Sequence, residues 1–168
     1  MTRLYKSLTV NNKGPYANFD FVPYLPVGGE PGPWLPKVEE LEICASGWHG
    51  CEGGDIIEYL NANIYEIETR GKVKKDDDKF TAQEIRFVRK CEGWNDSIAR
   101  LFACDCATHV LPIFEKRYPD DKRPRECIEI AHRFALGEAD CEELAAARDA
   151  ARDAERKWQV RRLLKLLK

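Results

Sequence analysis

A proline- and glycine-rich segment near the start of the chain, residues 11–37, sets the strongest limit on how this sequence can fold. It holds six of the nine prolines of the 168-residue chain, together with four glycines. Proline removes a backbone donor and fixes φ, so neither a regular helix nor a central strand can run through the segment. We therefore predict a long loop, and its five aromatic residues indicate that it is held on a surface rather than disordered.

The aromatic rings of this loop allow two interpretations, because aromatic residues dominate both cores and interfaces. In the first, the rings close over a core. In the second, they form a partner-binding face, to which a basic C-terminal helix could add charge. The candidate partner-binding residues are Tyr16, Phe21, Tyr24, Trp34, Arg161 and Arg162.

The rest of the chain shows the patterns of an α+β protein. Alternation of apolar and polar residues predicts strands, and a short helix is expected between the second and third of them. The predicted strands cover residues 3–9, 41–44, 64–69 and 79–90, with the helix at 54–60. From Gly93 onward the apolar residues fall at helical spacing, with a kink expected at Pro112 and a stop at Gly137. We predict two parts: a small mixed or antiparallel sheet domain at 1–92, with the long loop, and a three-helix subdomain at 93–168.

Composition narrows the class of protein. The chain is 43% hydrophobic and 33% charged, with a net charge of −2, which is typical of a soluble protein and does not indicate a nucleic-acid binder. No uninterrupted apolar run of membrane-spanning length is present, and the first residues lack the apolar core of a signal peptide. We expect no membrane partner and a cytoplasmic location, in the host cell if the protein is phage-encoded. Seven cysteines, an odd number, argue against a closed disulfide framework.

The stretch from Cys44 to Cys51 concentrates reactive side chains. Cys44, His49 and Cys51 could supply three zinc ligands, with a fourth from Cys91, Cys104 or Cys106. This spacing is not a standard metal-binding one, so we expect no metal, and the alternative is a tight glycine-rich turn in which His49 hydrogen-bonds the backbone.

Nucleophilic catalysis by His49 and Cys51 would require a third group to orient the histidine, and none is evident in the sequence. Glu66 and Glu68 lie on one face of a predicted strand, where paired acids could act as acid and base, although a solvated strand face is the more ordinary explanation. Cys104, Cys106 and His109 have weak metal-site spacing, and we interpret them as packing residues.

Two stretches resemble known families. The run Cys44-Ala-Ser-Gly-Trp-His-Gly-Cys51, with Tyr5-Lys6 before it and Tyr65-Glu-Ile-Glu68 after it, is similar to an uncharacterised domain common in phage and bacterial genomes. That resemblance covers about residues 3–90. Trp48 stands where the family has phenylalanine, and the long loop at 11–37 departs from the family's compact opening.

The second stretch covers residues 98–152. Its segments Phe102 to Glu115, Pro119 to Arg125 and Ala135 to Glu138, followed by an Arg/Ala-rich helix, resemble the Imm-5-like helical domain, which is immunity-protein-like. Neither resemblance supplies a catalytic residue. Both imply phage accessory, toxin-immunity or counter-defence proteins, which act by binding other proteins.

We therefore predict a non-enzymatic, phage-type accessory protein without a cofactor. Its partner would be another protein, plausibly a host defence complex such as a CRISPR effector, which would make it an anti-CRISPR-type inhibitor. A toxin-immunity protein is one alternative. A second is a small ADP-ribosyltransferase-like enzyme using NAD, with Arg3, His49 and Glu68 as candidate residues, although the middle motif of such enzymes is not evident.

Overall fold

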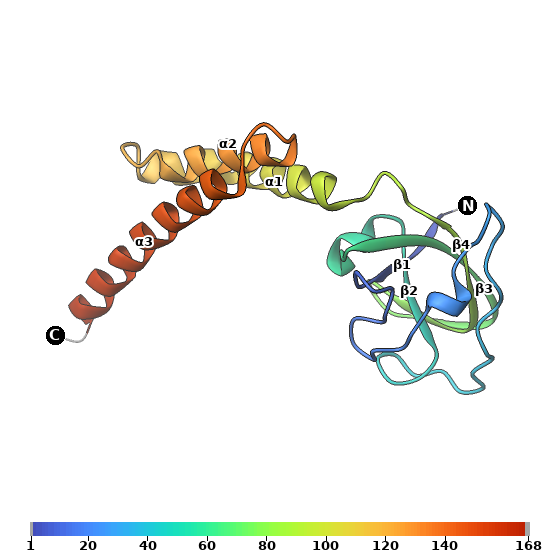
Figure 1. Cartoon of the computed structure of the whole chain (residues 1–168). Coiled ribbons are helices and arrows are strands. Elements are labelled where there is room, and N and C mark those ends of the chain that lie inside the picture. The colour runs from blue at the N-terminus through green and yellow to red at the C-terminus, as the bar shows by residue number, and fades with distance from the viewer. Residues whose placement is uncertain (1, 167–168) are drawn as a thin grey trace. The chain divides into compact units, whose positions relative to one another are not determined.

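A computed structural model describes residues 2–166, with side chains for all of these except 153–155, 157–159 and 161–166. The chain divides into two compact units, residues 1–95 and 96–168. All the strands belong to the first unit and the three long helices to the second (Figure 1). The predicted α+β class, a small sheet followed by three helices, is confirmed.

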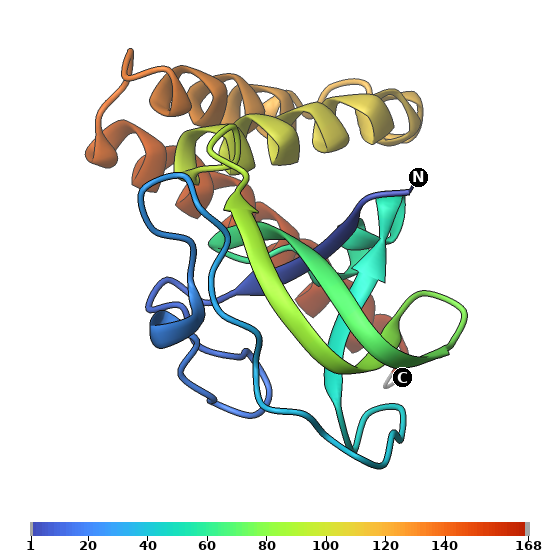
Figure 2. The ribbon, with the colours of Figure 1, turned by 90° about the vertical axis from the view of Figure 1, so that its right-hand side faces the viewer.

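The first unit is a small closed barrel in which every strand pair is antiparallel. Its strands are β1 (Leu4–Leu8), β2 (Trp48–Glu52), β3 (Asn63–Lys75) and β4 (Phe80–Lys90). They follow one another around the barrel in the order β1-β2-β4-β3, and β1 also pairs with β3 to close it. The long β3–β4 ribbon is strongly twisted (Figure 2), and its hairpin has more paired residues than any other strand pair of the barrel.

One of the two sequence predictions around the cysteine-rich stretch is wrong. Residues 41–44 form a turn rather than a strand, because Cys44 has a φ of 65° and the amide of Ser46 bonds back to the carbonyl of Glu42. The strand lies further on, as β2, within the glycine-rich stretch itself. The short helix predicted at 54–60 is present as a 3₁₀-helix, η2 (Gly53–Tyr59).

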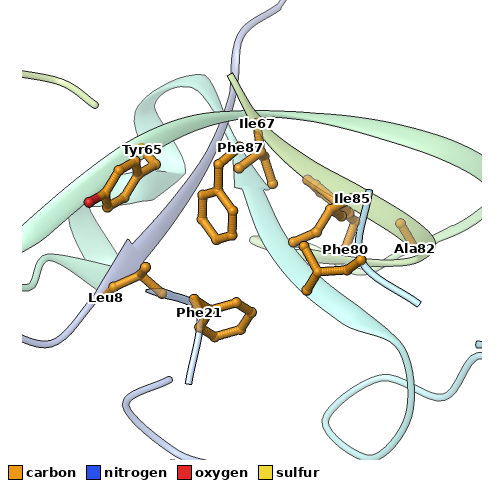
Figure 3. Close-up of a cluster of buried hydrophobic side chains, with 9 residues drawn as sticks. Leu8, Phe21, Tyr65, Ile67, Phe80, Ala82, Ile85 and Phe87 are labelled. Carbon is orange, nitrogen blue, oxygen red and sulfur yellow. The ribbon is translucent and has the colours of Figure 1, made fainter. Parts of the chain in front are cut away.

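The hydrophobic core of the barrel combines strand residues with residues of the long loop (Figure 3). Its fully buried members are Leu8, Phe21, Leu35, Tyr65, Ile67, Phe80, Ala82, Ile85 and Phe87. The ring of Phe87 is central, with edge-to-face contacts to Phe21 at 5.5 Å and to Tyr65 at 5.3 Å. Tyr65 and Ile67 face the core while Glu66 and Glu68 face away, as the alternation predicts.

The loop at 11–37 is irregular, as predicted, apart from a short 3₁₀-helix, η1 (Val22–Tyr24). It is held against the barrel by backbone hydrogen bonds. Along the part of β4 that β2 does not reach, the amides of Gly32, Leu35 and Val38 donate to carbonyls of β4 at 2.8, 2.9 and 3.0 Å. The loop thus occupies the edge of β4 that β2 leaves unpaired, and its apolar side chains complete the core.

The second unit consists of α1 (Asp96–Arg117), α2 (Arg123–Ala135) and α3 (Cys141–Leu166). Helix α2 packs against both α1 and α3. Pro112 lies inside α1, and Gly137, with a φ of 77°, follows the end of α2. Asp140 caps α3, because its carboxylate accepts the amides of Glu142 and Glu143 at 2.9 and 2.8 Å.

Among the described helices, α1 alone is long and apolar enough to cross a membrane by length and composition. Core helices of soluble proteins pass the same test, so this is weak evidence. Only 11% of this apolar window of α1 is buried.

The contrast between two loop aromatics gives a prediction about stability. Phe21 is 3% exposed and Tyr16 is 88% exposed. We expect Phe21→Ala to lower the free energy of unfolding by about 3–5 kcal/mol, because it empties a ring-sized volume of the core. Tyr16→Ala should change it by less than about 0.5 kcal/mol. Urea unfolding of both variants measures the difference, and equal effects would contradict the core described above.

Candidate functional site

The barrel wall is incomplete between β1 and β2. These strands pair only at Leu4 with Glu52 and at Tyr5 with Cys51, after which they diverge. A cavity of about 510 Å³ lies at this open seam. Residues from both faces of β2 line it, and the loop segment 14–21 forms another wall. The volume is within the range of small-molecule sites.

The glycine-rich turn before β2 shapes one side of the cavity. Gly47 has a φ of 95°, and a Cβ there would collide with side chains of Leu41 and Thr81. A Cβ on Gly50 would lie 2.7 Å from the ring of Phe80 and 2.8 Å from Ile67. Both positions therefore require glycine. Trp48, between them, packs against the core, and its indole donates to the carbonyl of Pro36 at 2.8 Å.

Lys6 is the most unusual residue of the cavity. It lies on β1 between Leu4 and Leu8, so its side chain shares their inward face. Its ammonium donates to the carbonyl of His49 at 2.7 Å and lies 5.1 Å from the centre of the Phe21 ring. No carboxylate of the described residues pairs with it. Burial lowers the pKa of Lys6 from 10.5 to about 8, against a smaller opposing effect of Cys51.

His49 is held by the backbone of the preceding turn. Its Nε2 accepts the amide hydrogen of Cys44 at 2.9 Å, so this nitrogen's lone pair is already used. Burial lowers the pKa of His49, and the charges of Lys6 and Lys79 lower it further, while a hydrogen bond with the backbone of Gly47 acts in the opposite direction. His49 is therefore neutral at pH 7. The alternative predicted for this stretch, a tight turn with a backbone-bonded histidine, is confirmed.

Cys51 is buried, with 2% of its surface exposed, and its sulfur lies 3.7 Å from the carbonyl oxygen of Tyr5. Burial raises the pKa of Cys51 to about 11, and the charge of Asp55 adds to the shift. A catalytic cysteine needs the opposite shift, toward thiolate. In this arrangement Cys51 is a packed thiol, and Cys44 is exposed on the turn. The described part of the chain contains no cluster of three or more potential metal ligands.

The polar edge of the cavity carries Tyr59 from η2 and Lys79 from the β3–β4 turn. The hydroxyl of Tyr59 donates to Asp78 at 2.6 Å, and Lys79 lies 3.6 Å from the same carboxylate. Burial, followed by the bond to Asp78, raises the pKa of Tyr59 to about 12. This trio fixes the edge of the cavity, and Asp78 balances the charge of Lys79 but not that of Lys6.

The predicted partner-binding residues of the loop do not lie on one surface. Phe21 is in the core, so the core-closing interpretation applies to it and a role as a surface anchor does not. Tyr24 is half-buried against the same core. Trp34 lies under the guanidinium groups of Arg70 and Arg86, at 4.5 and 4.9 Å from its ring. Tyr16 is exposed beside the cavity.

The side chains of Arg161 and Arg162 fall outside the described residues, so their predicted role stays a prediction. The three candidates for ADP-ribosyl transfer are not brought together. His49 lines the cavity, but Arg3 and Glu68 do not. Arg3 lies 3.6 Å from Glu66, and Glu68 pairs with Arg86 at 2.7 Å. Glu66 also pairs with Arg89, so both strand acids form part of surface ion pairs.

Sequence reasoning did not select Lys6 as a site residue. The signal was present, because the alternation of β1 places Lys6 on the same face as two leucines. A lysine on the apolar face of a strand must find a partner or a cavity. What could not be predicted was the divergence of β1 from β2, which creates that cavity.

In the helical unit, α1 presents apolar residues on two opposite sides. Cys104 and Leu111 are buried on one side. Cys106, His109, Val110 and Ile113 lie on the other side, and all four are exposed. Val110 is 53% and Ile113 75% exposed. We call these four residues the outer stripe of α1. The expected divergence of Cys104 from Cys106 is confirmed. The interpretation of these residues as packing residues holds for Cys104 but is wrong for Cys106 and His109, because both lie on the exposed side of the helix.

Comparison with known proteins finds a family match in the helical unit. Residues 95–160 match the family described as "Imm-5 like putative immunity protein". The match covers less than half of the chain, and it confirms the resemblance predicted for the C-terminal part. No curated protein matches the chain. No solved structure matches it either. The resemblance of residues 3–90 to a phage and bacterial domain stays a prediction.

The environment of Lys6 gives a prediction about titration. After reductive methylation with ¹³C-formaldehyde, we expect one dimethyl-lysine NMR signal to titrate near pH 8, while ordinary lysines titrate near about 10.4. The signal should be missing in Lys6→Met and present in Lys74→Met, which removes an exposed lysine. If every lysine titrates above about pH 10, the ammonium is not desolvated as described.

Proposed function

We propose that this protein is an immunity-type protein that acts by binding a protein partner through the outer stripe of α1. The observation that carries the proposal is the match of residues 95–160 to the immunity-protein family, since that match covers all of α1 and α2. The proposal requires no catalytic group, in keeping with the packed thiol of Cys51 and the backbone-bonded His49.

The packing of the helical unit supports a binding role. The described side chains of this unit that are fully buried are Cys104, Leu111, Ala135 and Leu144. Four buried residues make a thin core for a unit of three helices. At the same time large apolar residues are exposed, among them Val110, Ile113 and Leu136. Exposed apolar surface beside a thin core is typical of a helix face that packs against another molecule.

The surroundings of the stripe fit a protein partner. At the far end of α1, Glu115 forms a two-bond ion pair with Arg125 of α2, at 2.8 and 2.7 Å. At the near end, Arg100 stacks over Phe134 at 5.2 Å. Arg100 and Arg125 are thus engaged by Phe134 and Glu115. The charged residues next to the outer stripe are Asp105 on its side and Lys116 and Arg117 just beyond Ile113. An apolar centre with a polar rim is the ordinary anatomy of a protein interface.

A cytoplasmic location is part of this proposal. A more specific action, on a CRISPR effector or another host defence complex, is a prediction from the sequence that no feature of the helical unit singles out. Toxin immunity is favoured over it because the family that matches the helical unit is described as an immunity protein.

The outer stripe gives a prediction about partner capture. A photo-crosslinking amino acid at position 113 should form a discrete covalent adduct with one protein when the chain is expressed in its natural host. The same amino acid at position 129, an exposed site on α2, serves as the control and should not. Ile113→Asp should reduce capture about thirtyfold or more, as loss of a central apolar anchor does, with no loss of melting temperature because Ile113 is exposed.

Immunity is then tested on the captured protein. Expressed alone, it should arrest growth. Co-expression with the wild-type chain should restore growth, and co-expression with Ile113→Asp should not. A captured protein that is harmless, an adduct with lipid, or an adduct with a second copy of the chain only would each overturn the proposal.

A further inference from the structure

We propose that the seam cavity of the barrel is a binding site for a small aromatic anion, with the anionic group on the Lys6 ammonium and the ring against Phe19, Phe21 and Trp48. This site lies in the first unit and does not depend on the immunity role proposed for the second. Nothing in the family match bears on it, because that match begins at residue 95.

Charge is the first reason for an anion. Among the described residues that line the cavity there are two lysines and no carboxylate. Burial raises the pKa values of Cys51 and Tyr59 and lowers the pKa of His49, so in all three residues burial favours the uncharged form. Asp78, just beyond the wall, is already engaged by Tyr59 and Lys79. The charge that remains without a counter-ion is that of Lys6.

The hydrogen bonding of Lys6 is the second reason. An ammonium has three donors, and the carbonyl of His49 takes one of them. A face of Phe21 lies next to the group but accepts no ordinary hydrogen bond. Since Lys6 shares the face of Leu4 and Leu8 and the cavity lies at its side chain, the remaining donors are available to an occupant of the cavity. A methionine of similar length would fill the same space without a desolvated charge.

The walls explain why the occupant should carry a ring. Phe19 lies 4.8 Å from Phe21 and 5.0 Å from Trp48, with the rings tilted or edge-on to each other. Such a cluster leaves ring faces and edges for a further aromatic group. The cavity volume of about 510 Å³ fits a ligand of one or two fused rings. A metal cation does not fit this cavity, because it needs negatively charged ligands and the lining residues carry positive charge.

A matched pair of probes separates charge from shape. The probes are 2-naphthoate and its neutral amide, 2-naphthamide, and binding to the full-length chain is measured by calorimetry. We expect 2-naphthoate to bind with a dissociation constant below about 1 mM, a reasonable limit for a ligand of this size. The amide should bind at least about tenfold more weakly, since it cannot form a charge-assisted hydrogen bond with Lys6.

Variants assign the effect to Lys6. Lys6→Met should weaken 2-naphthoate about tenfold and leave 2-naphthamide nearly unchanged, whereas Lys74→Met, the same change on an exposed lysine, should alter neither. Phe19→Leu should weaken both probes. Circular dichroism and melting curves verify that each variant is folded. If Lys6→Met does not fold, Lys6→Arg and the pH dependence below decide the question.

The pH dependence gives an independent readout. Because the free ammonium loses its proton near pH 8, 2-naphthoate affinity should fall as the pH rises from about 7 to about 10, while 2-naphthamide affinity stays level. In Lys6→Arg the cation persists and this fall should disappear. The proposal is overturned if both probes bind alike, if neither binds, or if Lys6→Met and Lys74→Met have the same effect.

Discussion

The short contact between β1 and β2 is the constraint on which the rest of the barrel depends. A barrel of four strands closes only if β1 pairs on both of its edges, and here one edge pairs along the whole strand with β3 while the other pairs with β2 for two residues. β1 and β2 therefore close the barrel over two residue pairs and then separate. The cavity, the inward lysine and the exposure of the His49 carbonyl to that lysine all follow from this early divergence.

Two glycines, Gly47 just before β2 and Gly50 within it, determine how the divergence is built. Because Gly50 has no side chain, β2 can run close to Phe80 and Ile67. Trp48, two residues earlier in β2, packs against another part of the core. Gly47 supplies the positive φ from which the strand starts. After the last residue of β4 that pairs with β2, the proline-rich loop continues the hydrogen bonding along this edge through Gly32, Leu35 and Val38. One edge of β4 is thus shared between a strand and a loop, which explains how a segment with so many prolines contributes to the core.

Much of this arrangement was within reach of the sequence, and the limits have physical causes. The period-2 pattern of residues 64–69 and 79–90 predicted β3 and β4 and the inward side of Tyr65 and Ile67, because local alternation directly encodes a buried face. β2 was missed, since Gly50 within it and Gly47 just before it weaken the β-propensity signal, and its place is decided by contacts with distant Phe80. The divergence of β1 from β2 joins residues more than 40 positions apart, and no local pattern records it. Phe21 and Tyr16 look alike in sequence, yet only the fold separates the core residue from the exposed one.

The two units use apolar surface in opposite ways, and this separates their roles. The barrel turns Phe21, Tyr65 and Phe87 inward and places the Lys6 ammonium beside them, which under our proposal serves to recognise a small ligand. Among its described side chains the helical unit buries few and exposes the outer stripe of α1, which under our proposal is covered by a protein surface. A single ligand cannot satisfy both. Under the two proposals the barrel contributes something other than partner affinity, and a variant of Lys6 should leave capture at Ile113 unchanged.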